Sequence, residues 1–366
     1  MTRIAFVIRD NHKVKPGGDV DLAKKFAALL AGDFEVTVVT FAELEPRLFS
    51  CVVLFNLDDP FPNYLAARKC RAANVPFVIY ALHHKKGAIE SFLRRGSRGL
   101  QRCLAILAGG DALNYEMLAG MLRTILDGRA GQLWRYRSSR RMTRYLLAHA
   151  ACTLVSCSEE KDFIAADFGV AHFAHAVVPH QLPAVTAGYA PAPDHFILCA
   201  GRIEPRKNQL RLAALVAQHP EVRIVFVGKK NEKHTGYIQA FDQFCRQHPN
   251  LTWRQQVSLP DLLDLIRTAR IYVNMSWFEV FSLIDLMALQ IGTPALLSTG
   301  GYLADMPVMR ANPSLTFENP ADDAAIEQAL TRLWQSPVEA QVHFDPSWSE
   351  QSIRATWSRV LAEVRA

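Results

Sequence analysis

Charged side chains stand at two turns that could together bind an anionic group. The first turn carries Arg202 and Lys207 directly after an apolar strand-like run, and the second carries Glu279 after another. An arginine fork beside a lysine point charge suits a diphosphate, because both cations donate charge-assisted hydrogen bonds to phosphate oxygens. The two turns therefore predict a phosphate-binding site with a carboxylate close to it.

The residues that follow Glu279 predict a helix whose beginning and end are marked. Ser282 and Asp285 have the spacing of a capping box, in which the serine accepts a hydrogen bond from the backbone three residues later. Gly292 and Pro294 then end the helix. A strand, an acid on the next loop and a helix N-terminus at one edge form the usual anion site of a parallel sheet.

These two turns resemble those of the retaining nucleotide-sugar glycosyltransferases of the two-Rossmann type, the large family 4 group. The family pattern S-x-x-E-x-F-G-L-x-x-x-E-A-M-A-x-G-x-P is matched at many positions by residues 276–294, and G-R-x-x-P-x-K is matched by 201–207. The resemblance implies the α/β GT-B fold, with two Rossmann-like doubly wound domains that face a cleft. It implies that Glu279 is catalytic and contacts the transferred sugar or orients the donor. The implied donor-binding residues are Arg202, Lys207, Gly17, Gly18, Phe281, Ser282, Leu283 and Met287.

Position 287 departs from the family, because the second glutamate of its E-x7-E pattern is Met287 here. In the relatives this glutamate hydrogen-bonds the ribose hydroxyls, which a thioether cannot usefully do. Asp285 is no replacement, since two helical positions rotate a side chain by about 160°. Three interpretations stay open: another group holds the ribose, the donor site has changed, or the chain does not catalyse.

The N-terminal half opens as strand, glycine turn and helix. Gly17 and Gly18 follow the apolar run 4–8, and Asp19 is expected to cap the helix. A glycine pair before a helix is common turn chemistry, and it also matches the glycine loop of the family. After the apolar run 76–80 come His83 and His84. The resemblance places a sugar-contacting histidine at this strand end, and the spacing leaves both as candidates.

Positive charge is concentrated in residues 83–145, which hold thirteen Lys and Arg against four Asp and Glu in a chain of net charge +6. Such helices either turn a solvated charged side outward or bind an anionic lipid surface or acidic acceptor. Enzymes of this resemblance often use lipid-linked acceptors, which favours the membrane. The residues assigned to this acceptor or membrane face are Lys85, Lys86, Arg94, Arg95, Arg137 and Arg141. Nucleic acid is disfavoured, because no recognised binding module is present.

The length predicts two domains, with a hinge in the Pro/Ala/Gly-rich stretch 183–195. We expect an N-terminal acceptor domain over 1–185, a nucleotide-sugar domain over 186–348, and a helix over 349–366 that packs back on the first domain. The N-terminus lacks a signal sequence, no apolar run approaches a membrane span, and the seven cysteines form no C-x-x-C pair. These features predict a cytoplasmic protein, peripheral on the inner face of the cytoplasmic membrane if the basic face binds lipid.

The resemblance implies transfer of a sugar, as in hexosyltransferases, from a nucleotide-sugar to a glycan or lipid-linked glycan acceptor, in bacterial surface polysaccharide synthesis. Retention of configuration comes from the family alone. No cofactor or metal is expected, because Arg202, Lys207 and a helix N-terminus would neutralise the leaving diphosphate. The alternatives are a non-catalytic binding or scaffolding subunit, and epimerisation or phosphorolysis on the same architecture. The joint presence of both cations and Glu279 argues against the non-catalytic subunit. The sequence fixes neither the sugar, the nucleotide nor the oligomeric state.

Overall fold

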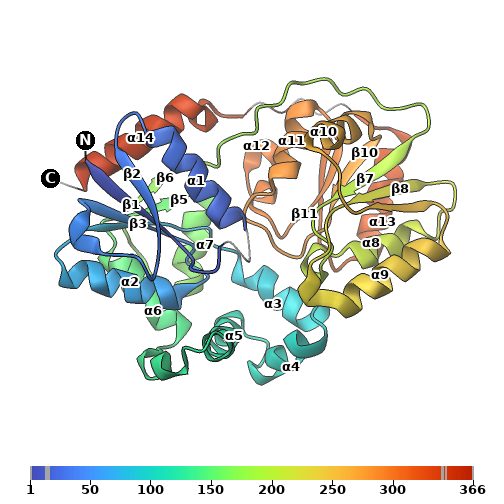
Figure 1. Ribbon diagram of the computed structural model, residues 1–366. Coiled ribbons are helices and arrows are strands. Elements are labelled where there is room, and N and C mark those ends of the chain that lie inside the picture. The colour runs from blue at the N-terminus through green and yellow to red at the C-terminus, as the bar shows by residue number, and fades with distance from the viewer. Residues whose placement is uncertain (1, 13–16, 339–341, 343, 365–366) are drawn as a thin grey trace. The chain divides into compact units, whose positions relative to one another are not determined.

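The computed structural model describes residues 2–12, 17–338, 342 and 344–364 (Figure 1). The chain divides into two compact units. The first comprises Met1–Lys86, Ile106–Gln181 and Asp345–Ala366, and the second comprises Gly87–Ala105 and Leu182–Phe344. The segment Gly87–Ala105 thus belongs to the second unit, although the sequence suggested one continuous N-terminal domain over 1–185.

The first unit contains a parallel six-stranded sheet in the order β2-β1-β3-β4-β5-β6. Its strands are β1 (Arg3–Ile8), β2 (Glu35–Thr40), β3 (Cys51–Phe55), β4 (Phe77–Tyr80), β5 (Cys152–Val155) and β6 (His175–Val177). The helices of this unit are α1 (Gly18–Leu30), α2 (Pro60–Ala72), α5 (Ala112–Leu126), α6 (Ser139–His149), α7 (Ser158–Phe168) and α14 (Glu350–Glu363), with a 3-10 turn η2 (Ala130–Arg135). The inner strands β3 and β4 are unbroken apolar runs because helices cover both faces of the sheet (Figure 1).

The C-terminal helix α14 packs into the core of the first unit. Trp357 is fully buried and its ring contacts those of Phe6, Phe26 and Tyr80, with centroid separations of 5.5, 5.2 and 6.1 Å. At the surface, Arg354 forms a bidentate pair with Asp33 at 2.9 and 2.8 Å. The return of the last helix to the first domain, expected from the resemblance, is therefore present.

The second unit holds another parallel six-stranded sheet, in the order β12-β11-β10-β7-β8-β9. Its strands are β7 (Phe196–Ala200), β8 (Arg223–Val227), β9 (Leu251–Arg254), β10 (Ile271–Asn274), β11 (Ala295–Ser298) and β12 (Leu315–Glu318). Its helices are α8 (Gln209–Val216), α9 (Thr235–Gln247), α10 (Leu259–Thr268), α11 (Leu283–Ile291), α12 (Pro307–Arg310) and α13 (Asp323–Gln335). Two more helices, α3 (Lys86–Arg95) and α4 (Gly99–Leu107), cover the segment Gly87–Ala105, where the chain leaves the first unit and joins the second before it returns.

Each sheet has one point where the direction of chain progression reverses. In the second sheet β7 continues to β8 on one side, while its other neighbour β10 continues to β11 on the opposite side. In the first sheet the corresponding point lies between β1 and β3. Loops at the carboxyl ends of the two strands diverge there, and the gap between them is where open α/β sheets bind ligands.

Candidate functional site

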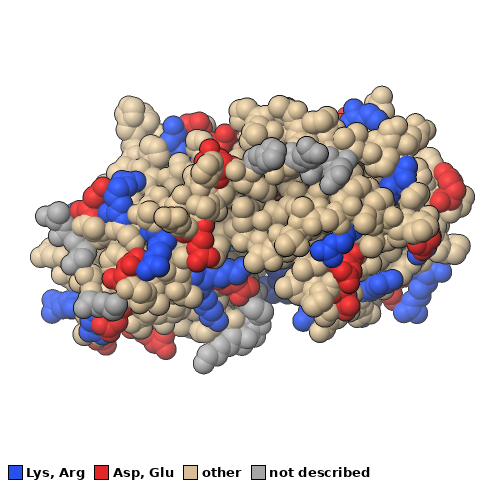
Figure 2. Space-filling view, turned by 90° about the horizontal axis from the view of Figure 1, so that it is seen from above, with Lys and Arg blue, Asp and Glu red and all other residues tan. Residues whose placement is uncertain are grey.

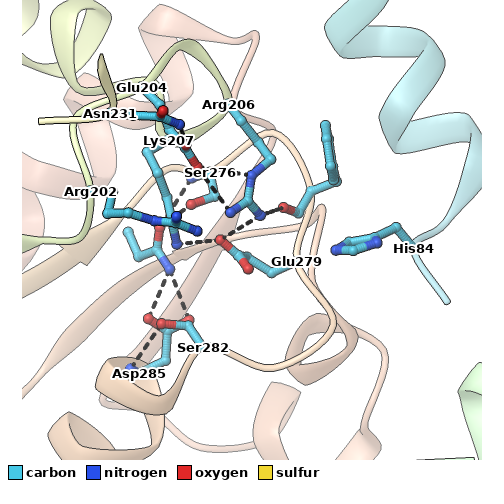
Figure 3. A network of polar contacts seen from close by, with 12 residues as sticks. His84, Arg202, Glu204, Arg206, Lys207, Asn231, Ser276, Glu279, Ser282 and Asp285 are labelled. Atoms are coloured by element: carbon cyan, nitrogen blue, oxygen red, sulfur yellow. Dashed lines mark hydrogen bonds and ion pairs between the residues drawn. The ribbon is translucent and has the colours of Figure 1, made fainter. Parts of the chain in front are cut away.

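The charged turns predicted from the sequence meet at the reversal point of the second sheet. Glu279 lies on the loop after β10, and Lys207 closes the 3-10 turn Pro205–Lys207 after the adjacent strand β7. Lys207 Nζ and Arg206 Nη1 both pair with Glu279 Oε1, the second at 3.2 Å. Figure 3 shows the side chains of Arg202, Arg206 and Lys207 gathered around this carboxylate. The structure therefore brings together the two expected cations and the expected acid.

Arg206 is a residue of this site that the sequence analysis did not single out. Its guanidinium donates to Glu204 Oε1 from two nitrogens, at 3.2 and 3.0 Å, and to the Phe278 carbonyl at 3.2 Å. Asn231 donates to the other oxygen of Glu204 at 2.5 Å. Burial opposes the charge of Arg206, but Glu279 and Glu204 raise its pKa above the usual value. Arg206 thus joins the two turns as a fixed cation.

The family pattern leaves the position of Arg206 unspecified, so spacing alone could not identify it. A basic residue beside Lys207 was the only signal in the sequence. The next residue, Asn208, has a left-handed φ of 61°, which asparagine tolerates, and its amide donates to the Pro320 carbonyl at 2.9 Å.

The loop that carries Glu279 is held by close packing on both sides. The Trp277 N–H donates to the Arg206 carbonyl at 2.8 Å. A Cβ at Gly300 would lie 2.2 Å from the Trp277 carbonyl oxygen, so only glycine allows the turn after β11 to approach the loop. Phe92 of α3 packs against the rings of Trp277 and Phe278, at 6.2 and 5.6 Å between centroids. A helix from the N-terminal half of the sequence therefore buttresses the site.

Helix α11 begins where the sequence predicted, because Ser282 is its N-cap and accepts from the Asp285 N–H at 3.4 Å. The Asp285 carboxylate, however, turns toward the sheet. It accepts from Tyr272 Oη at 2.7 Å and from Asn274 Nδ2 at 2.8 and 3.0 Å. Burial, the largest influence, raises the pKa of Asp285 to about 6. The aspartate thus ties α11 to β10, in addition to its place in the predicted capping box.

The remaining donor-site candidates of this stretch surround the start of α11. Phe281 and Ser282 are buried, and they line a narrow pocket with Glu279 and Asp285. Leu283 and Met287 are half-buried. Met287 is therefore not a core side chain, and its position leaves room for a polar replacement.

In the first unit, His83 is fully buried and both of its ring nitrogens contact carboxylates. Nδ1 lies 2.9 Å from Asp58 Oδ1, and Nε2 lies 2.9 Å from Asp167 Oδ2. Burial lowers the pKa of His83, but these carboxylates more than compensate and raise it. Such a ring is engaged within the protein and cannot also contact a sugar, so His83 is corrected from a catalytic candidate to a structural residue.

His84, unlike His83, is partly exposed and stays a candidate for contact with the sugar. Its backbone N–H and its Nδ1 contact Asp58 Oδ2 at 2.8 and 2.7 Å, and a quarter of its side chain is exposed. Asp58 also pairs with Lys86 at 2.8 Å, and the pKa of this aspartate lies well below its usual value because Lys86 and His83 outweigh its burial. Asp58 therefore fixes the orientation of the His84 ring.

The assignment of Lys85 and Lys86 to a membrane or acceptor face is wrong, because they are only 6% and 4% exposed. Lys86 is paired inside the unit with Asp58 and with Glu116 of α5, the latter at 2.5 Å. The four arginines of that face are exposed. Arg94 and Arg95 belong to the second unit, whereas Arg137 and Arg141 belong to the first.

The glycine turn of the first unit precedes helix α1. Gly17 is the N-cap in an extended conformation, and no side chain caps the helix. The expectation that Asp19 caps it is wrong, since Asp19 lies inside the helix and pairs with Arg9 at 2.8 Å. A Cβ at Gly17 would lie 2.1 Å from Arg9 Nη2, so the Arg9 side chain would have to move to admit one, whereas Gly18 is exposed.

The architecture of paired parallel sheets is that of the GT-B fold. Among solved structures, the chain is similar to a sucrose-phosphate synthase from Thermosynechococcus elongatus, with a TM-score of 0.63, 14% identity and coverage of 99% and 97% of the two chains. It is similar to the lipopolysaccharide outer core galactosyltransferase WaaB, with a TM-score of 0.62, 11% identity and coverage of 99% of each chain. It is also similar to Anabaena Alr3699/HepE in complex with UDP and glucose, with a TM-score of 0.60, 14% identity and coverage of 99% and 95% of the two chains. At these identities the likeness shows the fold alone.

A protein-family model matches most of the sequence of the second unit. Residues 189–347 match the family model described as Glycosyl transferases group 1. This range covers most of the second unit, and the convergent cations and Glu279 lie within it. No curated protein matches the sequence.

Within the described ranges, no helix is long and apolar enough to cross a bilayer. In the same part of the chain, no three His, Cys, Asp or Glu side chains are grouped so that they could hold a metal ion. Lysine and arginine are interspersed with acidic residues on the face that Figure 2 displays.

Proposed function

We propose that this protein transfers a sugar from a nucleotide-sugar to a glycan or lipid-linked glycan acceptor, in the synthesis of a bacterial surface polysaccharide such as lipopolysaccharide, O-antigen or capsule. The observation that carries the proposal is the convergence of Arg202 and Lys207 on Glu279 at the reversal point of the second sheet. This place lies beside the N-terminus of α11, which favours negative charge.

In the proposed reaction the bond between the anomeric carbon and the diphosphate oxygen breaks, and the oxygen leaves with the electron pair. An acceptor hydroxyl forms the new bond to the anomeric carbon and gives its proton to the departing diphosphate. Arg202, Lys207 and the start of α11 stabilise the charge that grows on the leaving diphosphate. Glu279 contacts the transferred sugar or orients the donor, as the resemblance implies. Retention of configuration is proposed from the resemblance.

The donor class is supported by relatives of the same fold. Structures of Anabaena Alr3699/HepE are described as complexes with UDP and with UDP-glucose. The neighbour WaaB is described as a lipopolysaccharide galactosyltransferase, which supports the proposed pathway. We propose cytoplasmic action at the inner face of the membrane, without a metal, since the cations named above offset the diphosphate charge.

One observation favours a second candidate function, a non-catalytic binding subunit. Met287 replaces the carboxylate that would hold the ribose, so the nucleotide loses a strong hydrogen-bond partner. A screen of thermal stability against UDP, GDP, dTDP, CMP and ADP separates the two functions, because a bound nucleotide raises the melting temperature. Stabilisation by one of them is expected. The absence of a shift with all five would overturn the transferase proposal in favour of the binding subunit.

A transfer assay with the nucleotide-sugar so identified completes the test. We expect equal turnover with EDTA and with added Mg²⁺. Product formed only when acceptor is present supports transfer, whereas conversion of the donor sugar without acceptor would indicate epimerisation.

A further inference from the structure

A large pocket of about 680 Å³ lies in the first unit, apart from the His83 and Lys86 network. Asp10, Ala42 and Asp59, which follow β1, β2 and β3, form one end of it. Helices α2 and α5 and the turn η2 supply its other walls. Because the chain reverses between β1 and β3, this pocket opens where the first sheet is expected to receive a ligand.

The lining residues carry a surplus of positive charge. Five cations, Arg68, Lys69, Arg123, Arg129 and Arg135, stand against the two carboxylates of Asp10 and Asp59. Arg123 pairs with Asp59 at 3.6 Å, and Arg129 pairs with Asp10 at 3.8 Å and with Asp127 at 3.0 Å; these partly exposed pairs are weak. With Asp127 counted, a formal surplus of two positive charges remains, which favours an anionic ligand.

An aromatic wall is built into the same pocket. The rings of Phe61 and Tyr136 stack with centroids 4.1 Å apart and planes at 19°. A Cβ at Gly120 would lie 2.3 Å from the Tyr136 hydroxyl, so a glycine on α5 makes room for this ring. Burial raises the pKa of Tyr136 to about 12, and the wall is therefore uncharged. An apolar chain can lie against it.

Large apolar side chains are exposed in the pocket wall and elsewhere in the segment 106–134. Trp134 lines the pocket and is 73% exposed, with the Arg135 guanidinium 4.9 Å from its ring centroid. Four more large exposed hydrophobic residues lie between 106 and 126: Ile106, Leu107, Ile125 and Leu126. Helix α5 carries Arg123, which lines the pocket, and also the exposed Ile125 and Leu126. Cations next to exposed apolar groups are typical of surfaces that bind amphiphiles.

We propose that this pocket binds an amphiphile in which a phosphate or diphosphate is joined to an apolar chain, and that it holds this part of the sugar acceptor. The role as acceptor site rests on the proposed glycosyl transfer, whereas the binding of the amphiphile does not. The cations of the rim take the phosphate, and Phe61, Tyr136 and Trp134 take the first part of the chain.

The test is titration of the whole protein with farnesyl diphosphate, farnesol or inorganic pyrophosphate, without any nucleotide-sugar. Farnesyl diphosphate is expected to bind at least tenfold more tightly than farnesol or pyrophosphate, because only it contacts both the cations of the rim and the aromatic side chains. Trp134→Ala and Arg135→Ala should each weaken it about fivefold or more. Equal binding of pyrophosphate and farnesyl diphosphate would overturn the proposal.

Two surface variants of the second unit serve as controls. Arg246, whose side chain is 78% exposed, and Leu259, which is 56% exposed, match the charge and the apolar exposure of the tested pair. Arg246→Ala and Leu259→Ala should leave binding unchanged, and a loss equal to that of the pocket variants would contradict a specific site. Vesicles of phosphatidylcholine, with and without phosphatidic acid, test whether the natural ligand is a membrane phospholipid. If phosphatidic acid competes as strongly as farnesyl diphosphate does, the pocket binds a membrane lipid and the acceptor role is contradicted.

The outcome is separable from that of the proposed function. Tight farnesyl diphosphate binding without any sugar transfer would leave the pocket established and remove the transferase. Sugar transfer with an unaltered acceptor KM in Trp134→Ala and Arg135→Ala would support the transferase and remove the pocket as its acceptor site.

Discussion

Arg206 Nη1 lies 3.2 Å from Glu279 Oε1, which places a cation from the loop after β7 against the acid from the loop after β10. Lys207 contacts the same oxygen. With two cations around one carboxylate, the site holds its positive groups in place before a ligand arrives. A diphosphate would then compete with Glu279 for cations that are already oriented, which is the arrangement that electrostatic catalysis requires.

The first prediction concerns Arg202 and Lys207. Replacement of either by alanine should lower turnover at least tenfold, because it removes charge stabilisation from the leaving diphosphate. Steady-state kinetics of folded variants measure this, with Arg246→Ala as the matched exposed arginine. Wild-type turnover in both variants would contradict the donor assignment.

The second prediction concerns the ribose. Met287 is half-buried, so Met287→Glu should fold and should restore a carboxylate that can accept ribose hydroxyls. Nucleotide affinity should rise by roughly tenfold or more, since a hydrogen bond to a charged group contributes about 1.5–3 kcal/mol. Calorimetric titration with the stabilising nucleotide measures it, and Met287→Gln is the neutral control. If Met287→Glu binds more weakly than the wild type, the ribose lies elsewhere.

The third prediction separates the adjacent histidines. His83→Ala should destabilise the first unit, because it removes a fully buried ring and the partly buried Asp58 and Asp167 both lose a partner; breaking a buried pair costs about 3–5 kcal/mol. His84→Ala should keep the melting temperature within a few degrees and lower turnover. Thermal unfolding and kinetics of both variants are compared with His172→Ala, an exposed histidine of the same unit. Normal turnover in His84→Ala would remove it from the site.

The fourth prediction is a pH dependence of stability that comes from Asp285. The pKa of this carboxyl is raised from 3.8 to about 6 in the folded protein. Between these values the folded state binds the proton more tightly than the unfolded state, so this contribution is present at low pH and is lost as the pH rises through about 6. Relative to Asp285→Asn, the wild type should lose roughly 1.4 kcal/mol of unfolding free energy per pH unit in that window.

Urea unfolding at several pH values measures this difference. The exposed Asp264, whose side chain is 72% accessible, supplies the control variant Asp264→Asn. Parallel stability curves for wild type and Asp285→Asn across the window would show that the buried carboxyl does not titrate as described.

Much of the fold follows from local patterns of the sequence. The apolar runs 4–8 and 76–80 nearly coincide with β1 and β4, because a strand covered on both faces needs no polar alternation. The start of α11 at Ser282 also followed from the sequence, since N-capping depends on residues three positions apart. Strand β12 escaped the sequence analysis, because Leu315–Glu318 is short and only partly apolar.

Other features depend on contacts between residues that are distant in sequence, and local patterns are silent about these. Arg206 belongs to the site because Glu204 and Glu279 both lie within reach of one guanidinium. The sequence made His83 a candidate for contact with the sugar and Lys86 part of an acceptor or membrane face. Asp58, Asp167 and Glu116 surround them in the fold and make burial of their charge tolerable.

The sequence by itself thus determined most of the strands, the start of α11 and which charged groups stand at the ends of strands, since these depend on neighbours along the chain. Only the tertiary structure decided which charges pair, which are buried and which helix supports the Glu279 loop. The reason is that strand order brings β7 beside β10, and α3 against Trp277, across long separations in sequence.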